Sequence, residues 1–312
     1  DFNIKNKLSD KKLKDLLSHF SRHRLRNEDF ENPDLMGSAY EYLIKQFADS
    51  AGKKGGEFYT PSEVVKLLVS LLKPRAGMKI YDPTVGSGGM LVTTRHYLID
   101  HGENPANLSL FGQEMNLNTW AICKMNMFLH GVFNADIRKG DTLRDPQHLS
   151  GGELQSFDRV IANPPFSLKK WGKDVADNDA YGRFPYCTPP KDAGDLAFIQ
   201  HMIASLNNEG KMGVVVPHGV LFRGASEMEI RKGILEDDLL EAVIGLPSAL
   251  FYGTGIPTCI MVFKKCREQD EDILFIDASE GFEKVGKQNV LRKEHIDKII
   301  DALFQIQGGY AL

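Results

Sequence analysis

The architecture of this chain is indicated most directly by the segment Lys79-Ile80-Tyr81-Asp82-Pro83-Thr84-Val85-Gly86-Ser87-Gly88-Gly89. A short apolar run ends in an acidic residue, a glycine-rich turn follows, and a helical pattern over Met90–His101 begins directly after it. Strand, loop and helix in this order are typical of a doubly wound α/β sheet, where ligands bind beyond the carboxyl ends of the strands. Glycines let the backbone of such a turn adopt positive φ and approach a ligand.

The spacing of this loop narrows the class of ligand. It matches neither G-x-G-x-x-G nor G-x-x-x-x-G-K-[ST], so dinucleotide and P-loop interpretations are weak. An acid at the strand end followed by G-x-G-G suits a ligand that carries an ammonium group and no pyrophosphate, such as the methionine end of S-adenosylmethionine. A tight structural turn between strand and helix is the alternative.

From Met78 onward, short apolar runs alternate with helical stretches, and this alternation predicts a mostly parallel sheet covered by helices on both faces. The predicted strands are Lys79–Tyr81, Leu108–Gly112, Ala135–Arg138, Arg159–Ala162, Met212–Val216, Leu240–Ile244, Thr258–Phe263 and Ile273–Ile276. The predicted helices include Met90–His101, Leu117–Leu129, Leu196–Leu206, Ser226–Glu236 and Lys293–Leu303. The short Gly/Pro-rich link between the runs at Leu240 and Thr258 predicts an antiparallel pair at one edge. The fold class is therefore a Rossmann-like α/β fold.

The first 52 residues have a different pattern. Apolar residues between Leu8 and Ala51 recur at helical spacing, which predicts helices. We expect residues 1–52 to form a helical segment, the end of a larger helical domain, and residues 53–312 to form the catalytic domain. At the start of the next helix, Thr60 as N-cap, Pro61 in the first turn and Glu63 form a predicted capping box.

Composition is that of a soluble globular protein, with 42% hydrophobic and 26% charged residues. No apolar run is long enough for a membrane span, and the N-terminus lacks the apolar core of a signal peptide. The four cysteines have no metal-ligand spacing, so we expect a cytoplasmic, reduced protein without a metal. A start without Met and the ending Gly-Gly-Tyr-Ala-Leu suggest a fragment of a longer protein.

The charge balance argues against independent DNA binding. The chain has 38 basic and 42 acidic residues, a formal net charge of −4. Neutralising phosphates normally requires a basic surface. If the chain acts on DNA, we expect a partner to supply most of the affinity for DNA.

Two acidic residues follow the next predicted strands. Glu114, in Gly112-Gln113-Glu114, is one βα unit beyond the glycine loop, where an acid commonly accepts hydrogen bonds from ribose hydroxyls. An N-cap or surface acid before the helix at Leu117 is the alternative. Asp141, in Gly140-Asp141, is a candidate acceptor for an adenine amino group, although Gly-Asp is also a common turn.

Asn163-Pro164-Pro165-Phe166 follows the strand Arg159–Ala162 and is the predicted chemical centre. The two prolines end the strand and remove two donors, which leaves the Asn163 side-chain oxygen and the Pro164 carbonyl as acceptors. Two acceptors can hold both hydrogens of an NH2 group and make its nitrogen nucleophilic toward a methylsulfonium carbon. Phe166 can stack on a base that has left the duplex. A rigid structural turn is the alternative.

The long polar segment Lys169–Gly194 contains several basic residues that could contact phosphate, with a solvated loop equally consistent: Lys169, Lys170, Lys173, Arg183 and Lys191. His201 and His218 are interpreted as packed or structural histidines rather than catalysts.

With these residues together, the sequence resembles the modification subunit of type I restriction–modification systems over essentially its whole length. The supporting motifs are Gly56–Pro61 (GEFYTP), the Asp82–Gly89 loop, Gly112-Gln113-Glu114, Asn163–Phe166, Asp195–His201 (DLAFIQH), Val216–Gly224 (VPHGVLFRG) and Leu246–Pro257 (LPSALFYGTGIP). Their order, with Phe-Tyr-Thr-Pro first, is similar to that of γ-type amino-methyltransferases.

The resemblance implies specific roles. Phe58 packs on the cofactor, beside Tyr59, and Thr60 holds its carboxylate end. The methionine pocket consists of Asp82, Thr84, Gly86, Ser87, Gly88 and Gly89. Glu114 binds the ribose and Asp141 the cofactor adenine, with Phe198 as a candidate adenine wall. Asn163, Pro164, Pro165 and Phe166 hold the target base. Cys187 replaces the glycine usual in the family, which leaves the geometry of its loop open.

The implied activity is methyl transfer from S-adenosylmethionine to N6 of an adenine flipped out of DNA. Implied partners are a specificity subunit, which selects the sequence, and a restriction subunit in the full complex. Two alternatives are a protein-glutamine N-methyltransferase, which usually carries Tyr in place of Phe166, and a non-catalytic assembly module. The four-residue motif alone does not distinguish adenine N6 from cytosine N4.

Overall fold

A computed structural model describes residues 9–23, 34–51, 59–251, 254–268, 271–286 and 288–308. Its main sheet contains β1 (Lys79–Asp82), β2 (Ser109–Glu114), β3 (Asp136–Lys139), β6 (Phe157–Ala162), β7 (Leu206–Pro217), β8 (Leu240–Gly245), β9 (Thr258–Lys264) and β10 (Leu274–Asp277). The longer helices are α1 (Asp10–Phe20), α2 (Leu35–Ala51), α3 (Ser62–Leu72), α4 (Gly89–Asp100), α5 (Leu117–Leu129), α7 (Asp195–Ala204), α8 (Ser226–Glu236) and α9 (Lys293–Gly308).

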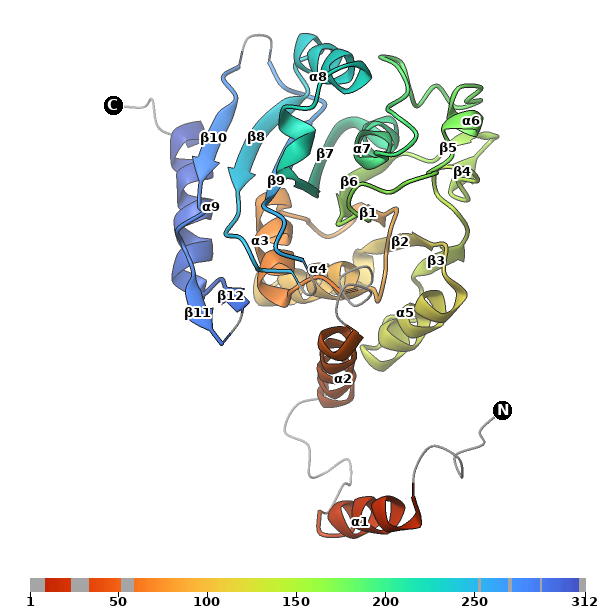
Figure 1. The fold of residues 1–312 in the computed structure, drawn as a ribbon, viewed down its shortest axis with the longest axis vertical. Coiled ribbons are helices and arrows are strands. Elements are labelled where there is room, and N and C mark those ends of the chain that lie inside the picture. The colour runs from red at the N-terminus through yellow and green to blue at the C-terminus, as the bar shows by residue number, and fades with distance from the viewer. Residues whose placement is uncertain are drawn as a thin grey trace.

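The strand order in the sheet is β10-β8-β9-β7-β6-β1-β2-β3 (Figure 1). All eight predicted strands are confirmed, and the pairs β1–β2, β1–β6, β2–β3, β6–β7 and β8–β10 are parallel. β9 runs antiparallel to both neighbours, β7 and β8. The predicted antiparallel pair β8–β9 is therefore present, and β10 extends the sheet beyond it because β10 pairs with β8.

Helices cover both faces of the sheet, as the alternation of apolar runs predicts. Ile80 and Ile161 belong to one core cluster, which includes buried residues of α3, α4 and α9. Their neighbours Tyr81 and Val160 belong to a second cluster with α7 and α8. Because successive strand residues point to opposite faces, β1 and β6 are buried on both sides. This double cover fixes the loops at the carboxyl ends of the strands.

The predicted N-terminal helices are present in the described residues. α1 buries none of its residues, and its N-cap Ser9 accepts a hydrogen bond from the backbone of Lys12. α2 packs on α5 and buries Ile44 and Ala48. The division of the chain at residue 52 lies outside the described residues and stays a prediction.

The start of α3 differs from the predicted capping box. The N-cap is Pro61, with extended ψ of 133°, and no side chain caps the helix. The Thr60 hydroxyl instead accepts a hydrogen bond from the Asn163 amide at 3.0 Å. The capping-box prediction is therefore wrong, because a contact with a residue distant in sequence occupies the hydroxyl.

Short elements complete the fold. Two hairpins, β4–β5 (Leu149–Ser150 and Glu153–Leu154) and β11–β12 (Glu283–Val285 and Gln288–Val290), have strands too short to predict from periodicity. Among the residues that the structure describes, a one-turn helix, α6 (Lys173–Ala176), and two 3-10 turns, η4 (Pro105–Asn107) and η5 (His218–Leu221), lie in connections. In the described part of the chain, no helix is both long and apolar enough to cross a membrane.

Candidate active site

A cavity of about 500 Å³ lies beyond the carboxyl ends of β1 and β6. These strands flank the switch point of the sheet, because the chain runs from β1 to β2 and β3 on one side and returns through β6 on the other. The cavity is lined by Glu41, Ile44, Tyr59, Thr60, Val65, Asp82, Thr84, Val85, Gly86, Ser87, Gly89, Met90, Asn126 and Asn163.

The glycine loop folds tightly into this cavity. Gly86 and Gly88 have φ of 54° and 85°, a region that favours glycine. A Cβ atom at position 88 would lie 2.6 Å from Cε of Met127 and 2.9 Å from Sγ of Cys123. Position 88 therefore requires glycine for both conformation and space. Contact with these two side chains of α5 therefore restricts the glycine loop to one conformation.

Asp82 lies at the end of β1 and is 2% exposed. Its Oδ1 accepts a hydrogen bond from the backbone N–H of Thr84 at 3.0 Å. Among the described residues Asp82 forms no ion pair, and burial, with a smaller contribution from the charge of Glu114, raises its pKa to about 8. A cationic group of a ligand bound beside this buried carboxyl group would stabilise its ionised form.

Glu114 closes the other side of the loop. Its Oε2 accepts from the N–H of Gly86 at 3.2 Å and its Oε1 from the N–H of Asn116 at 2.7 Å. Burial raises its pKa. Asn116, not Glu114, is the N-cap of α5. The Glu114 carboxylate, at the end of β2, therefore holds the glycine loop through the N–H of Gly86.

Several polar atoms around the cavity are buried with no hydrogen-bond partner among the described residues. They are Oγ1 of Thr84, Oδ1 of Asn126 and Oδ1 of Asn163. Buried polar atoms are nearly always satisfied, so unsatisfied atoms at one cavity indicate a polar ligand there. Together with Asp82, these acceptor oxygens fit a ligand that has cationic and hydroxyl groups, which S-adenosylmethionine has.

The Asn163-Pro164-Pro165-Phe166 turn is held from both ends. The Asn163 Nδ2 donates to the Thr60 hydroxyl, which leaves its Oδ1 as the free acceptor toward the cavity. The rings of Phe166 and Phe251 pack edge to face, with centroids 5.7 Å apart. The backbone N–H of Ser167, at φ 51°, donates to buried Asp195 at 2.8 Å. The turn is therefore preorganised.

Of the other predicted site residues, those that do not line the cavity are Gly88, Glu114, Asp141, Pro164, Pro165, Phe166 and Phe198. The Asp141 Oδ1 accepts from the N–H groups of Leu143 and Arg144. Phe198 is 5% exposed and packs with Leu143 and Trp171. Phe58 lies outside the described residues.

The sequence analysis missed residues that the structure brings to the cavity. Glu41 and Ile44 come from α2, and Asn126 comes from α5. The Asn126 Nδ2 donates to the Ser87 carbonyl at 3.0 Å. Its signal in the sequence is a polar residue on the buried face of an otherwise apolar helix. Asp195, which accepts from the N–H of Ser167 after the Asn163–Phe166 turn, and Phe251 were inside recognised motifs without an assigned role.

The structure also shows the surroundings of the two histidines and of Arg183. His201 is 1% exposed, and Nε2 of His218 donates to the Thr258 carbonyl at 2.9 Å, so both are structural as expected. Arg183 is 1% exposed and cannot contact phosphate from solvent. The phosphate interpretation is therefore wrong for Arg183, whereas Lys169, Lys170 and Lys191 are exposed.

The fold is that of the Rossmann-like methyltransferases. Within that class, the sequence model of the family described as N-6 DNA Methylase matches residues 31–309, and the chain belongs to this family.

The relatives include the type I restriction enzyme HindI methylase subunit of Haemophilus influenzae, 35% identical over 94% of this chain and 66% of its own length. The type I restriction enzyme MpnII methylase subunit of Mycoplasma pneumoniae is 36% identical over 93% of this chain and 55% of its own. The crystal structure of a type I restriction-modification system methyltransferase subunit from Streptococcus thermophilus has a TM-score of 0.80 and 41% identity, covering 87% of this chain and 57% of that one. The chain thus spans less than two thirds of the length of these relatives.

Proposed function

We propose that this chain is the catalytic part of a type I modification subunit, which transfers a methyl group from S-adenosylmethionine to N6 of adenine in DNA. The observation that carries the proposal is the shared cavity at the ends of β1 and β6. Asp82, residues of the glycine loop and Asn163 all line it. A cofactor and a substrate amino group would therefore meet there.

Residues of the cavity and two acids outside its lining, Glu114 and Asp141, would share the binding of the cofactor. Asp82 would accept the ammonium group, Gly86 and Ser87 would border the methionine end, and Thr60 would lie near the carboxylate. Glu114 would reach the ribose and Asp141 the adenine. The bound cofactor supplies an electrophilic methyl group on a sulfonium centre. Its positive charge suits a cavity with the buried carboxyl of Asp82.

Asn163 would act on the target base through its free Oδ1, which accepts one hydrogen of the base amino group. The Thr60 hydroxyl holds the Asn163 NH2 at 3.0 Å and so directs that oxygen to the cavity. The Pro164 carbonyl would accept the second hydrogen, and Phe166 would stack on the flipped base. Catalysis then rests on positioning and electrostatics, without a general base for the attack.

The partners are proposed from the resemblance and from charge. A net charge of −4 gives the chain little general attraction for DNA phosphates. A specificity subunit would select and grip the DNA, and a restriction subunit would join for cleavage. The exposed Lys169, Lys170 and Lys191 near the catalytic turn are the positions where this chain would add phosphate contacts.

The test uses Asn163→Ala in the complex reconstituted with its partner subunits. We expect the Kd for S-adenosylhomocysteine to stay within about threefold, while transfer falls about 10²- to 10³-fold, the usual loss for a preorganised polar contact at a reacting group. Asn178→Ala, at an exposed asparagine, is the matched control and should leave both unchanged.

Nucleoside analysis of the product identifies the acceptor. Methyl label in N6-methyladenine supports the proposal, whereas label in cytosine or in a protein glutamine overturns it. Full transfer by Asn163→Ala overturns the role of Asn163, even if the activity itself is correct.

A further inference from the structure

An arginine is buried in the long segment that follows the catalytic turn. The side chain of Arg183 is 1% exposed, and its Nη2 lies 2.7 Å from Oδ1 of Asp179, itself 7% exposed. Asp179 also accepts from the Arg183 backbone N–H at 2.7 Å. A buried guanidinium is expensive unless its hydrogen bonds are satisfied, so its remaining donors must have specific partners.

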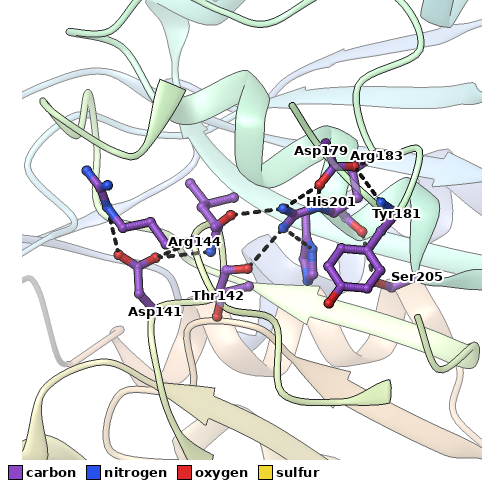
Figure 2. A network of polar contacts seen from close by, with 9 residues as sticks. Asp141, Thr142, Arg144, Asp179, Tyr181, Arg183, His201 and Ser205 are labelled. Atoms are coloured by element: carbon purple, nitrogen blue, oxygen red, sulfur yellow. Dashed lines mark hydrogen bonds and ion pairs between the residues drawn. The ribbon is translucent and has the colours of Figure 1, made fainter. Parts of the chain in front are cut away.

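Those partners are backbone carbonyls of the loop after β3. Nη1 of Arg183 donates to the Thr142 carbonyl at 3.1 Å, and Nη2 donates to the Leu143 carbonyl at 2.9 Å. Figure 2 shows the guanidinium between this loop and the Asp179 carboxylate. The planar fork of an arginine can span two such acceptors, whereas a lysine ammonium is a single point of contact.

The network extends to β1 through a histidine. Nδ1 of His201 lies 3.4 Å from Nη1 of Arg183, and its Nε2 lies 3.3 Å from the Tyr81 hydroxyl. Burial, with the nearby charge of Arg183, holds the pKa of His201 well below its usual value. The imidazole is therefore neutral and can accept from the guanidinium. Tyr81 directly precedes Asp82, so the network is anchored on the strand that carries Asp82.

The two carbonyls that Arg183 holds belong to the residues directly after Asp141. The Thr142 hydroxyl donates to the Pro83 carbonyl of the glycine loop at 2.5 Å. The Leu143 N–H donates to the Asp141 carboxylate at 3.1 Å. The two peptide planes fixed by Arg183 therefore present N–H groups to this carboxylate, whose Oδ2 also lies 3.5 Å from Nε of Arg144.

We propose that Arg183 is a positioning residue for the adenine end of the cofactor: its guanidinium fixes the loop that presents Asp141. The inference rests on the proposed function, in which Asp141 accepts from the cofactor adenine. The polar segment after the catalytic turn would then have a second role, which is to hold the loop that carries Asp141. This role is separate from any contact that its exposed lysines make.

The test compares Arg183→Lys with Arg267→Lys. Arg267 is also buried, at 2% exposure of its side chain, and donates to the Leu240 and Asp272 carbonyls. Arg267 follows β9 and contacts the amino end of β8, and it does not line the cavity. Both changes remove a guanidinium from buried carbonyls, but only the first touches the Asp141 loop.

Binding of S-adenosylhomocysteine and of 5′-methylthioadenosine is measured by calorimetry on the chain, with thermal melting as the measure of fold. We expect Arg183→Lys to raise the Kd of both ligands about tenfold, because both carry adenine and charge-assisted bonds to the loop are lost. Arg267→Lys should lower the melting temperature and leave both Kd values unchanged. At saturating cofactor, the transfer rate of Arg183→Lys should stay within about threefold.

Unchanged binding by Arg183→Lys overturns the inference, as does an equal loss of affinity in Arg267→Lys. If Arg183→Lys does not fold, Asp179→Asn carries the test, because it keeps the guanidinium but removes the charge that orients it. A Kd raised about threefold supports the inference, and an unchanged Kd overturns it. Failure of the wild-type chain to bind either ligand would count against the proposed function instead.

Discussion

The raised pKa of Asp82 makes a quantitative prediction for cofactor binding. Burial and the charge of Glu114 raise this pKa to about 8. With that value about 0.9 of the carboxyl groups are protonated at pH 7, and an ammonium ligand must bind the ionised form. Binding of S-adenosylhomocysteine should therefore release about 0.9 proton at pH 7.

The sign of the pH dependence follows from the same linkage. Below the pKa, a rise in pH increases the ionised fraction, so the affinity should rise about ninefold between pH 6 and pH 7, worth about 1.3 kcal/mol. Without ligand the effect on folding is opposite. The raised pKa contributes stability at low pH, below the ordinary value of 3.8, and that contribution is lost as the pH rises toward about 8.

The assay is calorimetry in two buffers of different ionisation enthalpy, repeated at pH 6 and pH 7. Asp82→Asn should bind weakly and release no proton from this site. Glu114→Gln should release less proton than the wild-type chain at pH 7, because removing its negative charge lowers the pKa of Asp82. Release of less than about 0.2 proton at pH 7, or equal affinity at both pH values, would refute the reasoning.

Two further changes test the site. Gly88→Ala should destabilise the fold by about 2–4 kcal/mol in urea unfolding, because it adds both αL strain and a clash with Cys123. Gly77→Ala, with φ of 89° and nothing within 4 Å of its Cβ position, isolates the strain and should lose only about 1–2 kcal/mol, so equal losses would contradict the steric argument. Thr60→Val should lower the transfer rate about tenfold with a smaller change in cofactor affinity, because the Asn163 amide loses its acceptor; a wild-type rate in single-turnover measurements would count against this.

Sequence patterns were sufficient for the sheet and for the residues that follow its strands. Strands buried on both faces appear as short apolar runs, and the runs at Lys79 and Arg159 each end in a cavity residue, Asp82 and Asn163. Because parallel strands end at the same edge, the topology alone brings these two together.

The contributions of the helices could not be predicted in the same way. Glu41 is one of several polar residues on α2, and only the packing of that helix on α5 turns it to the cavity. Thr60 fits the local pattern of an N-cap, but a partner 103 positions along the chain takes its hydroxyl. In the sequence Arg183 has the pattern of a solvated cation in a polar loop, and only the folded structure shows that its side chain is buried. Long-range contacts decided each case.

The place of β9 has a consequence for synthesis of the chain. β8 is made before β9, yet β9 lies between β8 and β7 in the sheet. Because synthesis proceeds from the amino terminus, one edge of β7 stays unpaired until β9 has been made as far as residue 264. At about 5–20 residues per second, the interval between completion of β7 and of β9 lasts several seconds. During that time β7 exposes a template for pairing with other chains, and early binding by a chaperone or partner would protect it.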